Sequence, residues 1–110
     1  MAEWRLASAD HRCSLALEAD DNGPLSGALT YEGQTYNVAG GWDASFSVPG
    51  RNFSAFSLSG RTGTNIPDFV AATGIMTGPG PAPTQIDIQL DVSSCNAGTI
   101  QHYKGVLVPA

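Results

Sequence analysis

The stretch "QIDIQLDV" (85–92) alternates strictly between apolar and polar residues. Successive side chains of an extended strand point to opposite faces, so its aliphatic residues share one face and Asp87, Gln89 and Asp91 share the other. A strand with one buried and one solvated face is typical of an antiparallel sheet. This stretch therefore predicts a β-strand whose aliphatic side packs on a core.

Alternation, rather than helical periodicity, continues through the rest of the chain. Turn signals recur about every ten residues, as expected of an all-β sandwich or barrel, and "DDNG" (20–23) and "YEGQ" (31–34) are the clearest. The best helical alternative is "IPDFVAATG" (66–74), with Asp68 as its N-cap. We expect strands over the following ranges: 3–8, 12–19, 25–31, 35–42, 45–48, 53–59, 69–76, 85–92 and 99–107.

The short connections between these strands favour pairing of sequence neighbours, which gives an antiparallel meander. A meander of this many strands is favoured to close, because closure removes exposed strand edges. We therefore predict one all-β domain over residues 1–110, a small antiparallel up-and-down β-barrel of eight to nine strands. A two-sheet β-sandwich is the alternative.

The stretch "TGPGPAPTQ" (77–85) is rich in proline and glycine and resembles a linker between domains. Only 27 residues follow Pro83, and they hold two expected strands. Because an isolated two-stranded hairpin is marginally stable in water, these strands must pair with the rest of the chain. The stretch therefore predicts a loop within one domain.

The composition limits the classes of partner. The chain has 42% hydrophobic and 14% charged residues, a net charge of −5 and only five Lys plus Arg, which are scattered. This argues against nucleic acid and anionic membranes as partners, because no basic stripe is present to neutralise phosphates. No signal peptide is visible at the N-terminus. We expect either an intracellular protein, with a cytoplasmic location favoured, or one whose signal was removed and Met1 added.

Two cysteines, Cys13 and Cys95, could form one disulfide that closes a long loop. The alternative, which we favour, is a pair of free thiols that pack as small apolar residues.

The aromatic residues are spread over nearly all the expected strands, where they either fill a core or line a ligand cavity. The most informative piece is "YNVAGGWDAS" (36–45), because Gly40-Gly41 allows a sharp bend or the close approach of another backbone. The candidate ligand-binding residues are Tyr36, Trp42, Asp43, Asp87, Gln89 and Tyr103.

The last two expected strands carry the candidates for acid–base chemistry. Asp87 and His102 could pair if the last two strands have a suitable register. If the apolar faces of these strands coincide, however, the two side chains lie on opposite sides of the sheet. Tyr103 and Gln101 are then the expected neighbours of the row that holds Asp87, and a bulge at Gly105 would explain why the strand changes character midway. The spacing of His and Cys predicts no metal site.

The run "LSGALTYEGQTYNVAGGWDAS" (25–45) resembles the early hairpin of avidin-type barrels, mainly at its Gly and Tyr positions. The resemblance covers about a fifth of the chain. The later tryptophan-rich strands of that family have no counterpart here, so no biotin-site residue is carried over.

These observations favour a non-enzymatic binding module that holds a small ligand in the mouth of the barrel and needs no cofactor. The first alternative is a protein-interaction or assembly domain, including a homo-oligomer, that uses exposed strands or loops. The second is a small enzyme built on Asp87, His102, Tyr103 or Lys104. A ligand barrel should contain a cavity, an interaction domain should expose an apolar patch, and an enzyme should bring two of these side chains into contact.

Overall fold

Alternating burial runs along the strands, as the sequence pattern requires. The computed structural model describes residues 2–44, 52–78, 82–94 and 97–110, and these form a closed antiparallel barrel. Its strands are β1 (Ala2–Ser8), β2 (Cys13–Ala19), β3 (Pro24–Tyr31), β4 (Gln34–Trp42), β5 (Phe53–Arg61), β6 (Phe69–Thr77), β7 (Gln85–Ser94) and β8 (Thr99–Pro109). Each strand pairs with the next and β1 pairs with β8, which confirms the predicted up-and-down barrel over the sandwich. The expected strand over 45–48 lies outside the described residues.

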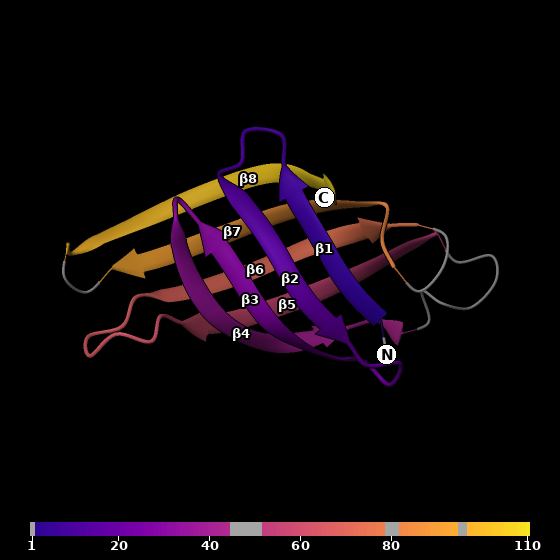
Figure 1. Cartoon of the computed structure of the whole chain (residues 1–110), viewed down its shortest axis with the longest axis horizontal. Helices are drawn as coiled ribbons and strands as arrows, with labels where there is room; N and C mark the ends of the chain where they lie inside the picture. The colour runs from indigo at the N-terminus through magenta and orange to yellow at the C-terminus, as the bar shows by residue number, and fades with distance from the viewer. Residues whose placement is uncertain (1, 45–51, 79–81, 95–96) are drawn as a thin grey trace.

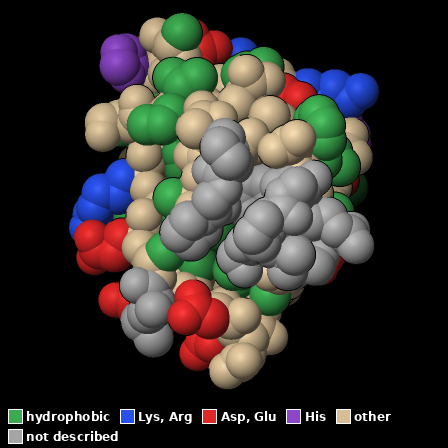
Figure 2. Space-filling model, turned by 90° about the vertical axis from the view of Figure 1, so that its right-hand side faces the viewer, with side chains coloured by type: hydrophobic (Ala, Val, Ile, Leu, Met, Phe, Trp, Pro, Cys, Tyr) green, Lys and Arg blue, Asp and Glu red, His purple; other side chains and the backbone are tan. Residues whose placement is uncertain are grey.

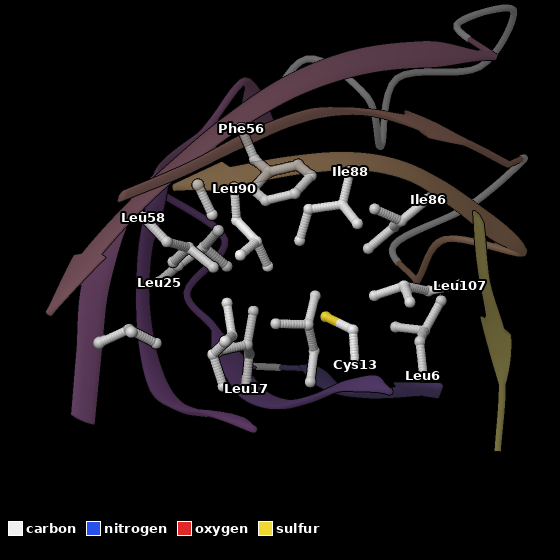
Figure 3. Packing of buried hydrophobic residues seen from close by; sticks show 14 of the residues in the cluster. Leu6, Cys13, Leu17, Leu25, Phe56, Leu58, Ile86, Ile88, Leu90 and Leu107 are labelled. Atoms are coloured by element: carbon white, nitrogen blue, oxygen red, sulfur yellow. The ribbon is translucent and has the colours of Figure 1, made fainter. Parts of the chain in front are cut away.

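The barrel is flattened, with extents of 46 × 26 × 18 Å. Figure 1 shows β1–β3 crossing in front of β5–β8, so the two halves of the barrel form layers with the core between them. Figure 3 shows Phe56, Ile88 and Leu90 of one layer pointing toward Leu17 and Cys13 of the other. Burial of each large apolar side chain contributes about 1.5–3 kcal/mol to stability, so this filled interior is the main source of stability.

The closure between β1 and β8 is short. Only Leu6–Ser8 of β1 pairs with Leu107–Pro109 of β8, and the backbone N–H of Ala110 adds one hydrogen bond to the Arg5 carbonyl oxygen. The preceding part of β8, Thr99–Val106, pairs with β7 on one side and with no strand of the described residues on the other. The seam of the barrel is therefore its least extensive strand pairing.

The predicted tight turns are confirmed by their backbone angles. Between β3 and β4, Glu32 and Gly33 have φ values of 52° and 79°, and positive φ at both central residues is the signature of a type I′ hairpin turn. Between β2 and β3, the N–H of Gly23 donates to the Asp20 carbonyl oxygen, with φ of 115° at Gly23.

Two glycines meet close neighbours, in different ways. A Cβ on Gly40 would lie 1.9 Å from the carbonyl oxygen of Ser57, so β5 makes the close backbone approach predicted at this position. At Gly105 the predicted bulge is wrong, because the pairing of β7 with β8 continues without interruption through the pair Ile88–Gly105. Here the ring of Tyr103 fills the space that a side chain would need.

The proline-rich stretch 77–85 connects two paired strands, because β6 and β7 pair as far as Thr77 with Gln85. The N–H of Thr84 donates to the Thr77 carbonyl oxygen; residues 79–81 are not described. The helical alternative over 66–74 is wrong, since Phe69–Thr77 is a strand. Within the described ranges, no helix is long and apolar enough to cross a membrane.

Candidate functional site

A small cavity lies at one end of the barrel, which we call the mouth. In an up-and-down meander every second connection falls at the same end, so the β1–β2, β3–β4, β5–β6 and β7–β8 connections all lie at this end. The last three of these connections and the strands beside them line the cavity. The cavity measures about 180 Å³. The lining residues used below are Tyr31, Glu32, Tyr36 and Asp68.

The aromatic wall of the mouth comes from the β3–β4 hairpin. Tyr31 and Tyr36 flank the type I′ turn at inward-facing positions, and both side chains are buried. Burial, and then the charge of Asp68, raise the pKa of the Tyr36 phenol above its ordinary value. Tyr36 is therefore neutral at physiological pH.

Asp68 supplies the acidic side of the mouth and is held in place by Thr62. The N–H of Asp68 donates to Thr62 Oγ1 at 3.1 Å, and the N–H of Thr62 donates to the Asp68 carbonyl oxygen at 3.0 Å. The carboxylate oxygen Oδ1 of Asp68 is buried and has no hydrogen-bond partner among the residues that the structure describes. No ion pair of Asp68 occurs within the described residues. Leaving a buried acceptor unsatisfied costs about 1–3 kcal/mol, and more for a charged group.

Arg12 is a cation fixed at the side of the mouth. Its guanidinium donates to the carboxylate of Glu32 and to the Tyr31 hydroxyl at 3.2 Å. The guanidinium carbon also lies 5.1 Å from the ring centre of Tyr103 and 5.9 Å from that of Tyr31, and these two rings are 5.3 Å apart. The aromatic surface at this end of the barrel therefore already accepts one cation.

The β1–β2 turn positions Arg12. The Ser8 hydroxyl donates to the Asp10 carboxylate at 2.6 Å and accepts the N–H of Cys13 at 3.1 Å. The N–H of Arg12 donates to the same Asp10 carboxylate at 3.0 Å, and His11 takes a positive φ of 59°. These bonds bend the chain tightly, so Arg12 leaves the turn directed over the tyrosine rings.

Of the six candidate ligand-binding residues, only Tyr36 and Tyr103 lie near the mouth. Trp42 is at the opposite end of the barrel, where it packs edge-on against Trp4 at 5.3 Å and donates from Nε1 to the Asp20 carbonyl oxygen at 3.0 Å. The N–H of Asp43 donates to the Ala55 carbonyl oxygen nearby. Figure 2 shows this opposite end, where the Lys and Arg side chains are few and lie apart.

Asp87 and Gln89 lie on the outer surface of the barrel. They share the exposed face of β7 with Asp91, as predicted. The register places Lys104 beside Gln89 and His102 beside Asp91. Gln89, Asp91, His102 and Lys104 line an open hollow of about 500 Å³ on the outside of the sheet, not a site inside the barrel.

The predicted neighbours of this acidic row are wrong. Tyr103 points into the barrel and is buried, whereas Ile100 and Val106 are 66% and 49% exposed. The more aliphatic face of β8 is thus the outer one, which brings His102 to the same side as the acidic row. His102 Nδ1 contacts the carboxylate of Asp91, not of Asp87, and both side chains of this pair are largely exposed.

Cys13 is a buried, free thiol, and burial raises its pKa to about 12. Cys95 lies outside the described residues, so its own state, free as we favour or bridged, stays a prediction. Across the described ranges, no group of three or more His, Cys, Asp or Glu side chains is placed to hold a metal ion.

Comparison of the chain with protein-family models, with curated proteins and with solved structures finds no match. The resemblance of 25–45 to avidin-type barrels gains no support from these comparisons. Function therefore has to be inferred from the barrel itself and from its mouth.

Proposed function

We propose that this chain is a non-enzymatic binding module that holds a small organic cation, an ammonium compound, in the mouth of the barrel. The observation that carries this proposal is the carboxylate of Asp68. It lines the cavity beside two tyrosines, and one of its oxygens is buried without a partner in the described part of the chain.

The charges around the mouth favour a cation. Glu32 and Asp68 both line the cavity, and Arg12 is paired with Glu32. One negative charge is therefore left at Asp68. A carboxylate next to a low-dielectric aromatic wall attracts a positive charge more strongly than one in open water.

The aromatic wall favours the same ligand class. Ammonium and guanidinium groups bind over tyrosine rings within about 6 Å of the ring centre. The guanidinium of Arg12 does so over Tyr31 and Tyr103. A ligand cation would use the remaining surface of Tyr31 and Tyr36.

The size of the cavity limits the ligand. A volume of about 180 Å³ corresponds to roughly six water molecules at their liquid density. It lies below the ~300 Å³ at which pockets for drug-sized molecules begin, and the interior beneath it is filled with apolar side chains. A ligand with only a few non-hydrogen atoms, such as a methylated or short-chain ammonium ion, fits this description.

Binding is favoured over catalysis at this site. Nucleophilic catalysis requires a nucleophile within hydrogen-bond reach of a base. Tyr36 and Asp68 line one cavity, yet no hydrogen bond joins them among the interactions of the described residues.

The proposal is tested by titration of the protein with tetramethylammonium and ethylammonium, followed by calorimetry and by NMR shifts of Tyr31 and Tyr36. Neopentane-like neutral isosteres and acetate serve as ligand controls. We expect Asp68→Asn, which keeps the shape and removes the charge, to weaken cation binding at least tenfold. Asp87→Asn removes the same charge from the outer face and should leave binding unchanged. Equal binding by Asp68→Asn and the parent chain would contradict the proposal.

A further inference from the structure

The first part of β8 has an open edge. Thr99–Val106 pairs with β7, and the pairing with β1 begins only at Leu107. We propose that this edge pairs with the same edge of a second copy of the chain, so that two barrels share one continuous antiparallel sheet. This inference is independent of the ligand proposed for the mouth.

The pairing of β8 with β1 shows which backbone N–H and C=O groups of β8 point toward the open edge. The N–H of Ala110 donates to the Arg5 carbonyl oxygen, so even-numbered residues of β8 direct their N–H and C=O groups toward the β1 side. The register with β7 has no interruption between Ile86–Leu107 and Ser94–Thr99, so this parity holds along the strand. The open edge thus presents the backbone groups of Ile100, His102, Lys104 and Val106. A row of unpaired strand groups is a template for pairing with another chain.

This row is complementary to itself. A two-fold axis through Tyr103 places Ile100 opposite Val106 of the second copy and His102 opposite its Lys104. Both members of each pair direct their backbone groups across the junction, so the strands exchange about eight hydrogen bonds. A shift of the register by one residue would turn the backbone groups of one strand away.

Several two-fold registers would allow the same backbone hydrogen bonds between the two copies, and the side chains favour this one. A two-fold axis through Lys104 would set two lysines opposite each other, and one through His102 would set Ile100 against Lys104. The axis through Tyr103 instead pairs the exposed side chains of Ile100 and Val106, which are 66% and 49% exposed in the single chain. Like charges directly opposite are unfavourable, whereas apolar pairs are favourable.

The charges on the outer face also fit. Asp91 contacts His102 within the chain. In the proposed pairing, Lys104 of the second copy comes opposite His102, and Asp91 lies on the far side of His102, two strands from that lysine. The long lysine side chain can extend over His102 toward this acid, and the arrangement occurs twice by symmetry.

The edge is accessible. A hollow of about 300 Å³ separates Tyr103–Val106 of β8 from Ser8–Asp10 at the β1–β2 turn. Figure 1 shows β8 extending well past the end of β1, with β7 on one side only. Within the described residues, no strand pairs with this side of Thr99–Val106.

The experiment is sedimentation velocity of the full chain over a range of concentrations. We expect a monomer–dimer equilibrium for the parent chain. Ile100→Lys alone and Val106→Glu alone should each shift it toward the monomer at least tenfold. An equimolar mixture of the two variants should recover a heterodimer, because the lysine of one then faces the glutamate of the other. Circular dichroism checks that each variant is folded.

The matched control is Phe53→Lys, which removes a large exposed apolar side chain from β5, three strands from the edge. It should leave the dimer intact. In the parent chain, hydrogen exchange at the amides of His102 and Lys104 should slow as concentration rises. A monomer at all concentrations, a dimer that survives both charge variants, or equal loss with Phe53→Lys would each overturn the proposal. The proposal would also be overturned if hydrogen exchange at these amides slowed only after a different protein was added, because the edge would then bind that protein and not a second copy.

Discussion

The ring of Tyr103 covers Gly105, two residues further along the same strand: a Cβ on Gly105 would lie 2.3 Å from the Tyr103 hydroxyl oxygen and 2.7 Å from two ring carbons. The ring also packs against Tyr31 and beneath Arg12. The glycine therefore allows Tyr103 to lean along the strand and to form the side of the mouth.

Gly105→Ala should destabilise the chain by about 1–3 kcal/mol, the usual cost of overpacking a well-packed site. The same substitution in a Tyr103→Leu background should be neutral or stabilising, because glycine within a strand costs about 0.5–1 kcal/mol relative to alanine. Urea unfolding of the four chains of this double-mutant cycle gives the coupling energy. Equal effects in both backgrounds would show that the ring does not occupy this space.

Thr62 should be required for the position of Asp68. Thr62→Val leaves the N–H of Asp68 without its acceptor, which we expect to cost about 1–3 kcal/mol and to weaken cation binding at the mouth. Thr62→Ser keeps the hydroxyl and is the matched control. Chemical denaturation and ligand titration of both variants test this, and a valine variant as stable as the serine variant would contradict it.

The β1–β2 turn should lose stability in acid. Hydrogen bonds from the Ser8 hydroxyl and then from the Arg12 N–H lower the pKa of Asp10 below its ordinary value of 3.8. A carboxyl whose pKa is lower in the folded state stabilises the fold above its unfolded pKa, and this contribution disappears as the pH falls through the folded pKa. We expect Asp10→Ala to lower Tm at neutral pH, and the difference from the parent chain to shrink below about pH 4. A difference that does not change with pH would argue against this role of the carboxylate.

Cys13 should be unreactive in the folded chain. The thiolate is the reactive form, and burial raises the pKa of Cys13 to about 12, so little thiolate forms at neutral pH. In a Cys95→Ser variant, a disulfide reagent should label Cys13 only as fast as the chain unfolds. Fast labelling in native buffer, at a rate independent of denaturant, would mean that the thiol is accessible.

The strands and their inward faces were predictable because alternation alone sets the face of a residue once one side is buried. It assigned "QIDIQLDV" correctly, and it confined the turn at Glu32–Gly33 to two residues. It misassigned β8, because Ile100 and Val106 make the outer face more aliphatic than the inner face. On the inner face of β8, the buried ring of Tyr103 fills the space beside Gly105. No sequence pattern predicts this packing.

The mouth was only partly predictable. Tyr36 could be chosen as an aromatic residue at a strand end, but Arg12, Tyr31 and Asp68 come from three connections that are far apart in the sequence. The signal that could have found them is the topology, since alternate turns of a meander meet at one end. Asp68 was interpreted as a helix cap, and only the strand that follows it shows that its carboxylate faces the mouth.

The short seam between β1 and β8 also governs how this chain folds. It joins the first and last strands of the barrel, so its contacts have the largest sequence separation in the molecule, and such contacts form late and slowly. The seven pairings between successive strands can form before the two ends of the chain meet. Closure is then a separate late event, and the seam is where the native barrel would first reopen.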